Sequence, residues 1–235
     1  MTALRSTQPT PELTASVEDY LKVIFELESG DGSRNAVAGT NEIAAALGIA
    51  APSVSGMIRR MAEHGLITHE RYRGVRLTDA GRRAALRTIR RHRVIEAYLT
   101  TALGYPWDRV HAEAERLEHA ASDELIDRMA AAIGEPATDP HGAPIPTREG
   151  LLDAPSLPTL ADAEPGTRVR VERVGDRDPQ RLRYLAELGI LPGTEVEVVS
   201  REPFDGPITL QVGSAQHAIG PALAREILVA PVEPE

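Results

Sequence analysis

Four side chains able to bind a metal ion recur at helical spacing between residues 111 and 119. A helix turns by about 100° per residue, so residues three, four, seven and eight positions apart share one face. The spacing therefore predicts a helix that presents two imidazoles and two carboxylates together. Carboxylates that are three positions apart repel one another unless a cation neutralises them. The four residues are His111, Glu115, Glu118 and His119.

A second candidate pair lies upstream, where His92 and Glu96 stand one helical turn apart. The chain has no cysteine, so every candidate ligand offers nitrogen or oxygen. Such donors suit a hard divalent ion better than a soft one. Two simpler interpretations stay open, namely an exposed helix pair at His92 and Glu96 and a solvated acidic face at 111–119. The histidines at 64, 69, 141 and 217 lack spaced acidic partners and are predicted to be surface or core residues.

Charge is strongly segregated along the chain, although the net charge is −9. Residues 50–93 contain eleven arginines and three acidic residues, whereas residues 94–165 contain four arginines and fourteen acidic residues. This order suggests phosphate contact in the first segment and cation binding in the second. No apolar run could span a bilayer, and the N-terminus lacks the apolar core of a secretion signal. We therefore expect a cytoplasmic protein without a membrane partner.

The N-terminal third has the pattern of a winged helix-turn-helix. A helix capped by Ser16 precedes a helix of about eight residues after Thr40, and a third helix follows at 52–65. Two short strands, 66–68 and 75–77, then flank a basic tip. In such a fold the second helix of the motif enters the major groove of DNA. The predicted DNA-contacting residues are Pro52, Ser53, Ser55, Arg59, Arg60 and Arg73. A winged helix used only for protein contacts is the alternative.

The rest of the chain is predicted to be helical at first and to form β-strands toward its end. Three further helices are expected, from Thr78 to about Leu103, at 108–120, and from Ser122 to Gly134. A proline-rich segment, 135–165, reads as linker or wrapping arm. Predicted strands at 168–174, 195–200, 208–212 and 226–229, with a short helix at 180–188, indicate a small SH3-like barrel. The expected division is a flexible tail (1–13), a DNA-binding domain (14–77), a metal-binding and dimerisation domain (78–150), a linker (151–165) and the SH3-like domain (166–235).

Several separate motifs resemble the diphtheria toxin repressor family, and the resemblance covers nearly the whole chain in the same domain order. They lie at 18–21, 52–55, 90–93, 111–119 and 140–146. The resemblance implies a metal-dependent, homodimeric transcription regulator that binds double-stranded operator DNA and ends in an SH3-like, FeoA-like domain.

The same resemblance implies the ligands of two metal sites. Asp19, Glu115, Glu118 and His119 match the first site, and His92, Glu96 and His111 match the second. Asp176 is a further candidate from the final domain, whereas Arg173, at another matching position, cannot bind a metal. Aspartate at 19 and glutamate at 115 are typical of the manganese-responsive branch, since the iron-responsive branch has methionine and cysteine there. Lys22 departs from shorter manganese regulators, which have a glutamate.

Asp19 also has a structural interpretation, because it stands three residues after Ser16 and could complete a capping box. The preferred function is a repressor of metal-ion homeostasis genes with Mn²⁺ as corepressor, and not an enzyme. The same switch responding to Fe²⁺ or another divalent metal is the first alternative. A dimetal carboxylate enzyme and a constitutive architectural DNA-binding protein are two further ones.

Overall fold

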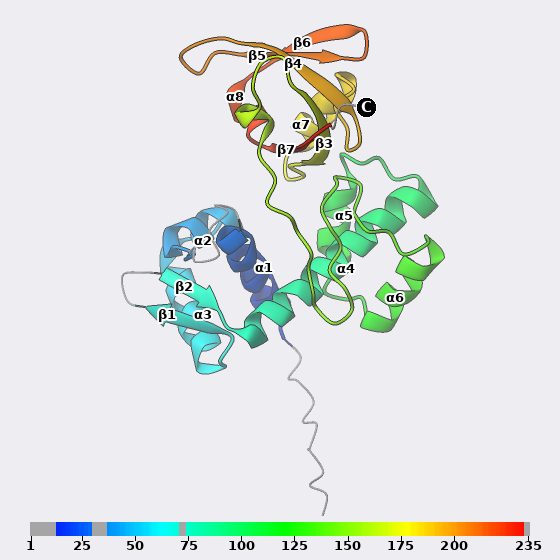
Figure 1. The fold of residues 1–235 in the computed structure, drawn as a ribbon. Coiled ribbons are helices and arrows are strands. Elements are labelled where there is room, and N and C mark those ends of the chain that lie inside the picture. The colour runs from blue at the N-terminus through cyan, green and yellow to red at the C-terminus, as the bar shows by residue number, and fades with distance from the viewer. Residues whose placement is uncertain (1–12, 30–36, 71–73, 233–235) are drawn as a thin grey trace, which may run out of the picture. The chain divides into compact units, whose positions relative to one another are not determined.

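The computed structural model describes residues 13–29, 37–70 and 74–232. They belong to two units, Met1–Leu86 and Arg87–Glu235. Figure 1 shows the helices and strands in chain order. Within the described ranges, no helix combines the length and apolar character needed to cross a membrane.

The first unit is a winged helix-turn-helix, as the sequence predicts. Its β-hairpin is antiparallel, with Ile67 opposite Leu77, and Ala38 forms a further antiparallel bridge with Val75. Apolar side chains at helical spacing, among them Leu21 and Ile58, form the core of this unit. The elements are α1 (Ala15–Ser29), α2 (Thr40–Leu47), α3 (Ala51–Glu63), β1 (Ile67–Glu70) and β2 (Gly74–Leu77).

The start of α1 differs from the prediction. The carbonyl of Thr14 accepts a hydrogen bond from the backbone N–H of Glu18 at 3.1 Å, so Thr14 immediately precedes the first turn. Ser16 lies inside that turn, and its predicted role as the N-cap is wrong. A capping box between Ser16 and Asp19 therefore has no helix start to stabilise.

A buried carboxylate ties the end of α1 to the wing. Glu28 Oε1 accepts a hydrogen bond from the backbone N–H of Leu77 at 2.6 Å, and its Oε2 pairs with Arg82 at 2.5 Å. Burial of a charge is costly unless it is paired and hydrogen-bonded. Both oxygens of Glu28 are satisfied, so the contact holds α1, β2 and the first turns of α4 (Asp79–Leu103) together.

Helices α4, α5 (Val110–Leu117) and α6 (Asp123–Ala132) surround an apolar core in the second unit. The predicted Ser122 cap is confirmed, because its Oγ accepts a hydrogen bond from Leu125 at 3.2 Å. Helix α5 is shorter than the predicted 108–120. Its last turn is followed by a bend, in which the N–H groups of Ala120 and Ala121 bond to the carbonyl of Leu117. Glu118 and His119 therefore lie just beyond the helix.

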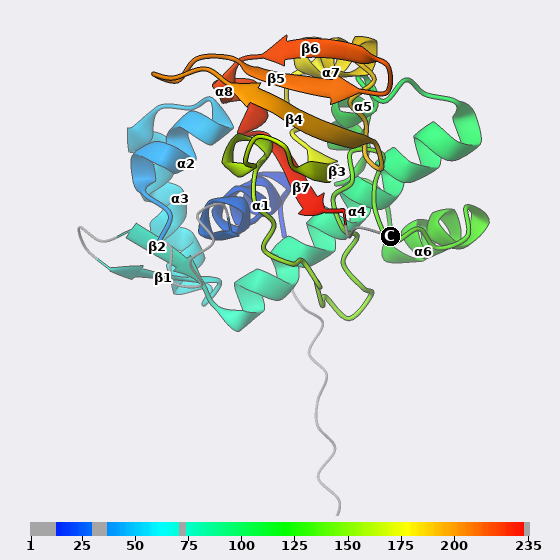
Figure 2. The ribbon, with the colours of Figure 1, turned by 45° about the horizontal axis from the view of Figure 1, so that its top comes forward.

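The second unit ends in an SH3-like barrel. Its five strands are antiparallel in the order β6-β5-β4-β3-β7, as Figure 2 shows from a second direction. A separate apolar core fills it, and Trp107 from the segment before α5 packs against that core. Strand β6 and helix α8 were not predicted, because β6 has few β-branched residues. The elements are η1 (Leu160–Asp162), β3 (Arg168–Val174), α7 (Pro179–Glu187), β4 (Glu195–Arg201), β5 (Ile208–Val212), β6 (Ala215–Ile219), α8 (Pro221–Ala224) and β7 (Ile227–Pro231).

Candidate metal centre

Helix α4 supplies two buried donors, His92 and Glu96, from successive turns of its inner face. The Nε2 atom of His92 lies 2.9 Å from Glu96 Oε1. The interpretation of this pair as an exposed helix pair is wrong, because the side chains of His92 and Glu96 are 4% and 0% exposed.

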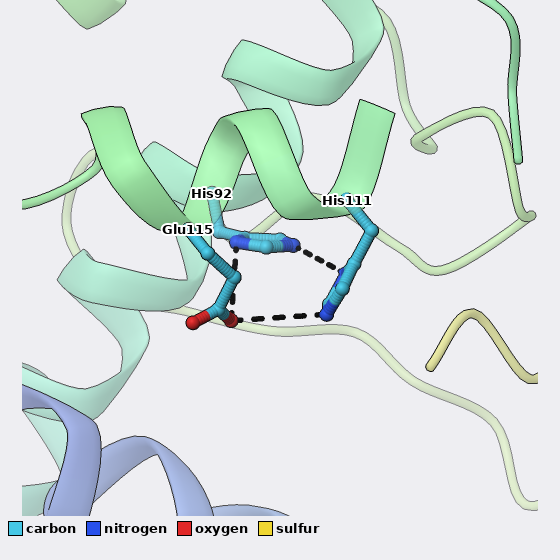
Figure 3. A group of neighbouring side chains, drawn as sticks. All are labelled: His92, His111 and Glu115. Carbon is cyan, nitrogen blue, oxygen red and sulfur yellow. Dashed lines mark hydrogen bonds and ion pairs between the residues drawn. The ribbon is translucent and has the colours of Figure 1, made fainter. Parts of the chain in front are cut away.

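Helix α5 brings two more donors against this pair. His111 Nδ1 lies 3.1 Å from His92 Nε2 and 3.2 Å from Glu96 Oε1. Glu115 Oε1 lies 3.9 Å from His92 Nδ1 and 3.8 Å from His111 Nε2. Figure 3 shows the two imidazoles and the Glu115 carboxylate pointing toward one another. Glu115, predicted for the first metal site, thus lies beside donors predicted for the second.

Glu118, also predicted for the first metal site, likewise lies beside a donor predicted for the second. Its Oε2 is 2.5 Å from His92 Nδ1, and its Oε1 is 3.6 Å from the Nε2 of His119. Glu118 is fully buried, whereas His119 is half-buried. Donors of the second unit that the sequence divides between two sites, namely Glu115 and Glu118 of the first and Glu96 and His111 of the second, therefore all lie next to His92.

The C-terminal domain contributes a carboxylate to this group. Asp176, two residues after β3, has its Oδ2 3.8 Å from His111 Nδ1. Donor atoms of Asp176, Glu96 and His111 all lie within 4.8 Å of one another. Arg173, on β3 itself, carries a guanidinium and offers no lone pair to a cation.

The donor set fits a divalent cation. Burial opposes the charged form of Glu96, but His111, His141 and His92 outweigh it and hold the pKa of Glu96 well below its ordinary value. Glu96 therefore stays ionised although it is enclosed. Its Oε2 has no hydrogen-bond partner. Carboxylate oxygens and imidazole nitrogens are suitable ligands for hard and borderline ions such as Mn²⁺.

Two buried residues beside Glu96 were not predicted as part of a site. His141 Nδ1 lies 3.8 Å from Glu96 Oε2, and Asp139 shares the same cluster. Burial lowers the pKa of His141, but the neighbouring carboxylate of Glu96 dominates and raises it to about 9. The two residues follow Glu96 by more than forty positions, so helical spacing could not reveal them. The 140–146 motif was the one available signal.

Asp19 lies half-buried on α1, in the first unit. The other predicted ligands belong to the second unit. The predicted DNA-contacting residues are also in the first unit. On α3, Val54 and Ile58 are buried, whereas Pro52, Ser53, Ser55, Arg59 and Arg60 are exposed. Arg73 lies outside the described residues.

The composition of residues 50–93 suggested phosphate contact, but several of its arginines form ion pairs within the protein. Arg87 and Arg91 on α4 both pair with Asp123 at the start of α6, and Arg90 pairs with Asp127 at 3.2 Å. These arginines join α4 to α6. The phosphate contact suggested for residues 50–93 therefore competes, at Arg87, Arg90 and Arg91, with ion pairs inside the second unit.

Known domain families match the chain along most of its length. The N-terminal DNA binding domain of iron dependent repressors matches residues 12–75, and their metal binding and dimerisation domain matches residues 78–147. A FeoA domain matches residues 159–231.

Individual relatives agree with these matches. The iron-dependent repressor IdeR of Mycobacterium leprae is 34% identical over 203 residues, which cover 80% of this chain and 85% of the relative. A solved manganese-dependent transcriptional repressor in complex with manganese is 41% identical, with a TM-score of 0.85 over 92% of this chain and 100% of that one. The manganese regulator SloR is 30% identical, with a TM-score of 0.77 over 94% and 100% of the chains.

The winged helix, the buried donor group and these matches define a metal-dependent, DNA-binding transcriptional repressor. Such proteins regulate by binding and are not enzymes. The chain belongs to the diphtheria toxin repressor family.

Proposed function

We propose that the chain is a Mn²⁺-dependent repressor that acts as a homodimer, with Mn²⁺ as its corepressor. The observation that carries this proposal is the group of nitrogen and oxygen donors around His92. A chain without cysteine offers no thiolate, and the group contains no thioether, so nothing in it favours a soft metal.

Two sites would share this group. The first takes Asp19, Glu115, Glu118 and His119, and the second takes His92, Glu96, His111 and Asp176. Because Asp19 lies on α1, an ion in the first site joins the DNA-binding unit to the helices of the second unit. Coordination then selects the arrangement in which the dimer fits its operator. Such a population shift requires that the metal binds that arrangement more tightly than others.

The exposed face of α3 would read the major groove. Small side chains at Ser53 and Ser55 let the backbone approach base edges, while Arg59 and Arg60 reach phosphates or bases. In a dimer, two such helices contact half-sites about one turn of DNA (~34 Å) apart, or at a related spacing. The partner is therefore double-stranded operator DNA.

An Fe²⁺-dependent repressor is the second candidate, and the 34% identity to IdeR favours it. Intrinsic affinity does not decide between the two ions, because divalent metals later in the Irving–Williams order bind a given site more tightly than Mn²⁺. Donor geometry and the free concentration of each ion set the selection.

DNA binding at buffered metal concentrations tests the proposal. A DNA duplex that binds the protein is first selected from a random library on immobilised protein in the presence of Mn²⁺. Fluorescence anisotropy then measures the affinity of the protein for this duplex under three conditions: with Mn²⁺, with Fe²⁺ under anaerobic conditions, and with a chelator. We expect tight binding with Mn²⁺ and loss of binding with chelator. Equal binding with chelator would show a constitutive DNA-binding protein, and activation by Fe²⁺ alone would show the iron-dependent alternative.

A further inference from the structure

His141 occupies a fully enclosed position between the metal centre and the C-terminal domain. Its Nε2–H donates to the carbonyl of Trp107 at 2.7 Å, and its ring stacks on that indole with centroids 5.7 Å apart. The opposite ring nitrogen, Nδ1, faces Glu96 Oε2 at 3.8 Å. Neither Nδ1 nor Oε2 has a hydrogen-bond partner. Buried polar atoms seldom lack a hydrogen-bond partner, so these two atoms are suited to form a hydrogen bond with one another.

The loop that carries His141 is held from several sides. Asp139 Oδ1 accepts hydrogen bonds from the backbone N–H groups of His141 and Ala143 at 2.9 and 3.0 Å. Arg93 on α4 donates to the carbonyl of Pro144 at 2.5 Å, and its Nε lies 3.7 Å from Asp139 Oδ2. The imidazole therefore has a defined position relative to α4, from which Glu96 projects.

The same loop is bound to the barrel. The carbonyl of His141 accepts a hydrogen bond from the backbone N–H of Val174 at 2.9 Å. At Gly142, which has φ +88°, a Cβ would lie only 1.9 Å from the carbonyl oxygen of Glu172. The two backbones thus approach more closely than any residue with a Cβ permits, at Glu172 on β3, four positions before Asp176.

We propose that His141 is a positioning residue for the second metal site, which orients Glu96 through a hydrogen bond from Nδ1–H to Oε2 and ties that carboxylate to the C-terminal domain. A shift of the carboxylate by about 1 Å brings the two atoms to hydrogen-bond distance. Glu96 then presents Oε1 to the ion, beside His92 and His111. Outer hydrogen bonds of this kind fix ligand orientation and commonly change metal affinity by about 10- to 100-fold. The inference rests on the proposed second site.

Two substitutions separate positioning from packing. His141→Gln keeps a donor near Nε2 for Trp107 and loses the donor near Nδ1. His141→Asn keeps a donor near Nδ1 for Glu96 and loses the one near Nε2. Both variants are made in the full-length chain with Asp19→Ala, which removes one ligand of the first site and so reduces its contribution to the titration. His217→Gln, at a histidine on β6 of the barrel, is the matched control.

Titration with Mn²⁺, followed by the electron paramagnetic resonance signal of the free ion, gives the affinity. We expect His141→Gln to weaken the second site about tenfold and His141→Asn to stay within about threefold of its parent. Trp107 is the sole tryptophan of the chain, so its emission reports directly on the neighbourhood of residue 141 in each variant. An unaltered emission maximum in His141→Asn shows that the loop is retained.

Equal loss in both variants, or no loss in His141→Gln, overturns the positioning role. An Asp19→Ala parent that binds no Mn²⁺ overturns the second site itself, and with it this inference. A native chain that binds no Mn²⁺ and no DNA overturns the proposed function. The three failures are therefore distinguishable.

Discussion

His92 on α4 and Glu118 just beyond α5 meet in the interior of the second unit, with Nδ1 and Oε2 2.5 Å apart. We assign His92 and Glu118 to different proposed metal sites, so their contact would set the two proposed sites side by side. An ion that binds either residue has to alter this pair. Occupancy of one site is therefore expected to change the affinity of the other.

Removal of the Glu118 charge should weaken metal-dependent DNA binding. Glu118→Gln keeps the shape of the side chain but loses a buried anionic ligand, and we expect Mn²⁺ affinity to fall by at least about tenfold. Anisotropy with operator DNA at buffered Mn²⁺ measures the effect. Glu113→Gln is the control, since Glu113 forms an i, i+3 ion pair with Arg116 on another side of α5. Equal DNA affinity in both variants would contradict the role of Glu118.

Replacement of oxygen by sulfur donors should change the metal response. In Asp19→Met/Glu115→Cys two hard donors are lost and two soft ones appear, so activation should shift from Mn²⁺ toward Fe²⁺. The measurement is the buffered concentration of each ion that gives half-maximal DNA binding. An unchanged ratio of these concentrations would argue against selection by donor hardness.

The arginines of α3 should act through DNA phosphates or bases. Arg59→Ala and Arg60→Ala remove exposed cations, and removal of one phosphate interaction should reduce the slope of log affinity against log salt by about one. Titrations at several salt concentrations give the slope. Arg168→Ala, on β3 of the barrel, provides a control with the same change of charge. A slope that stays constant in both α3 variants would show that these arginines do not bind phosphates.

Asp123 should contribute stability that disappears in acid. Burial raises its pKa, but the guanidinium groups of Arg87 and Arg91 dominate and lower it from the ordinary value near 3.8. A group with a lowered folded pKa stabilises above its unfolded pKa, and this contribution is lost as the pH falls through the folded pKa. Since Asp123 is 45% exposed, we expect Asp123→Asn to cost at most about 1 kcal/mol at pH 7.

Denaturant unfolding of native chain and variant, from pH 7 to pH 3, measures this difference. It should be constant near neutrality and shrink below about pH 4. Asp153→Asn, at an exposed position before the barrel, should show no such trend. A difference that persists unchanged at pH 3 would rule out the ion pairs as its source.

Gly142→Ala should weaken the attachment of the barrel to the helices. Gly142 and Gly193 have nearly the same φ, +88° and +89°, but an added Cβ meets the Glu172 carbonyl only at Gly142. The backbone strain of alanine at positive φ, about 1 kcal/mol or more, is common to both variants. Any additional loss in Gly142→Ala, measured by thermal unfolding, is the cost of the clash. Equal losses would mean that the two backbones separate freely.

Local patterns in the sequence were enough to predict most helices and strands. Apolar periodicity located α1, because a buried helical face requires apolar residues every three or four positions, and start and stop residues located α3 and α4. The spacing from His111 to His119 predicts four metal ligands on one helix face, and their binding of a metal stays a prediction. The same spacing misjudged the end of α5, which the structure places at Leu117, before a turn.

Tertiary structure decided which donors meet. His92 and Glu118 are neighbours because α4 packs against α5 around Val94, Ile95 and Val110, and no spacing rule encodes that packing. Arg87 and Arg91, which resemble DNA contacts in composition, instead neutralise Asp123. His141 has no acidic residue at helical spacing, yet it is enclosed beside Glu96. The sequence by itself determined which donor types are available, nitrogen and oxygen without thiolate, because the chemistry of a side chain is local. Their grouping depended on long-range packing, which brings together residues far apart in the chain.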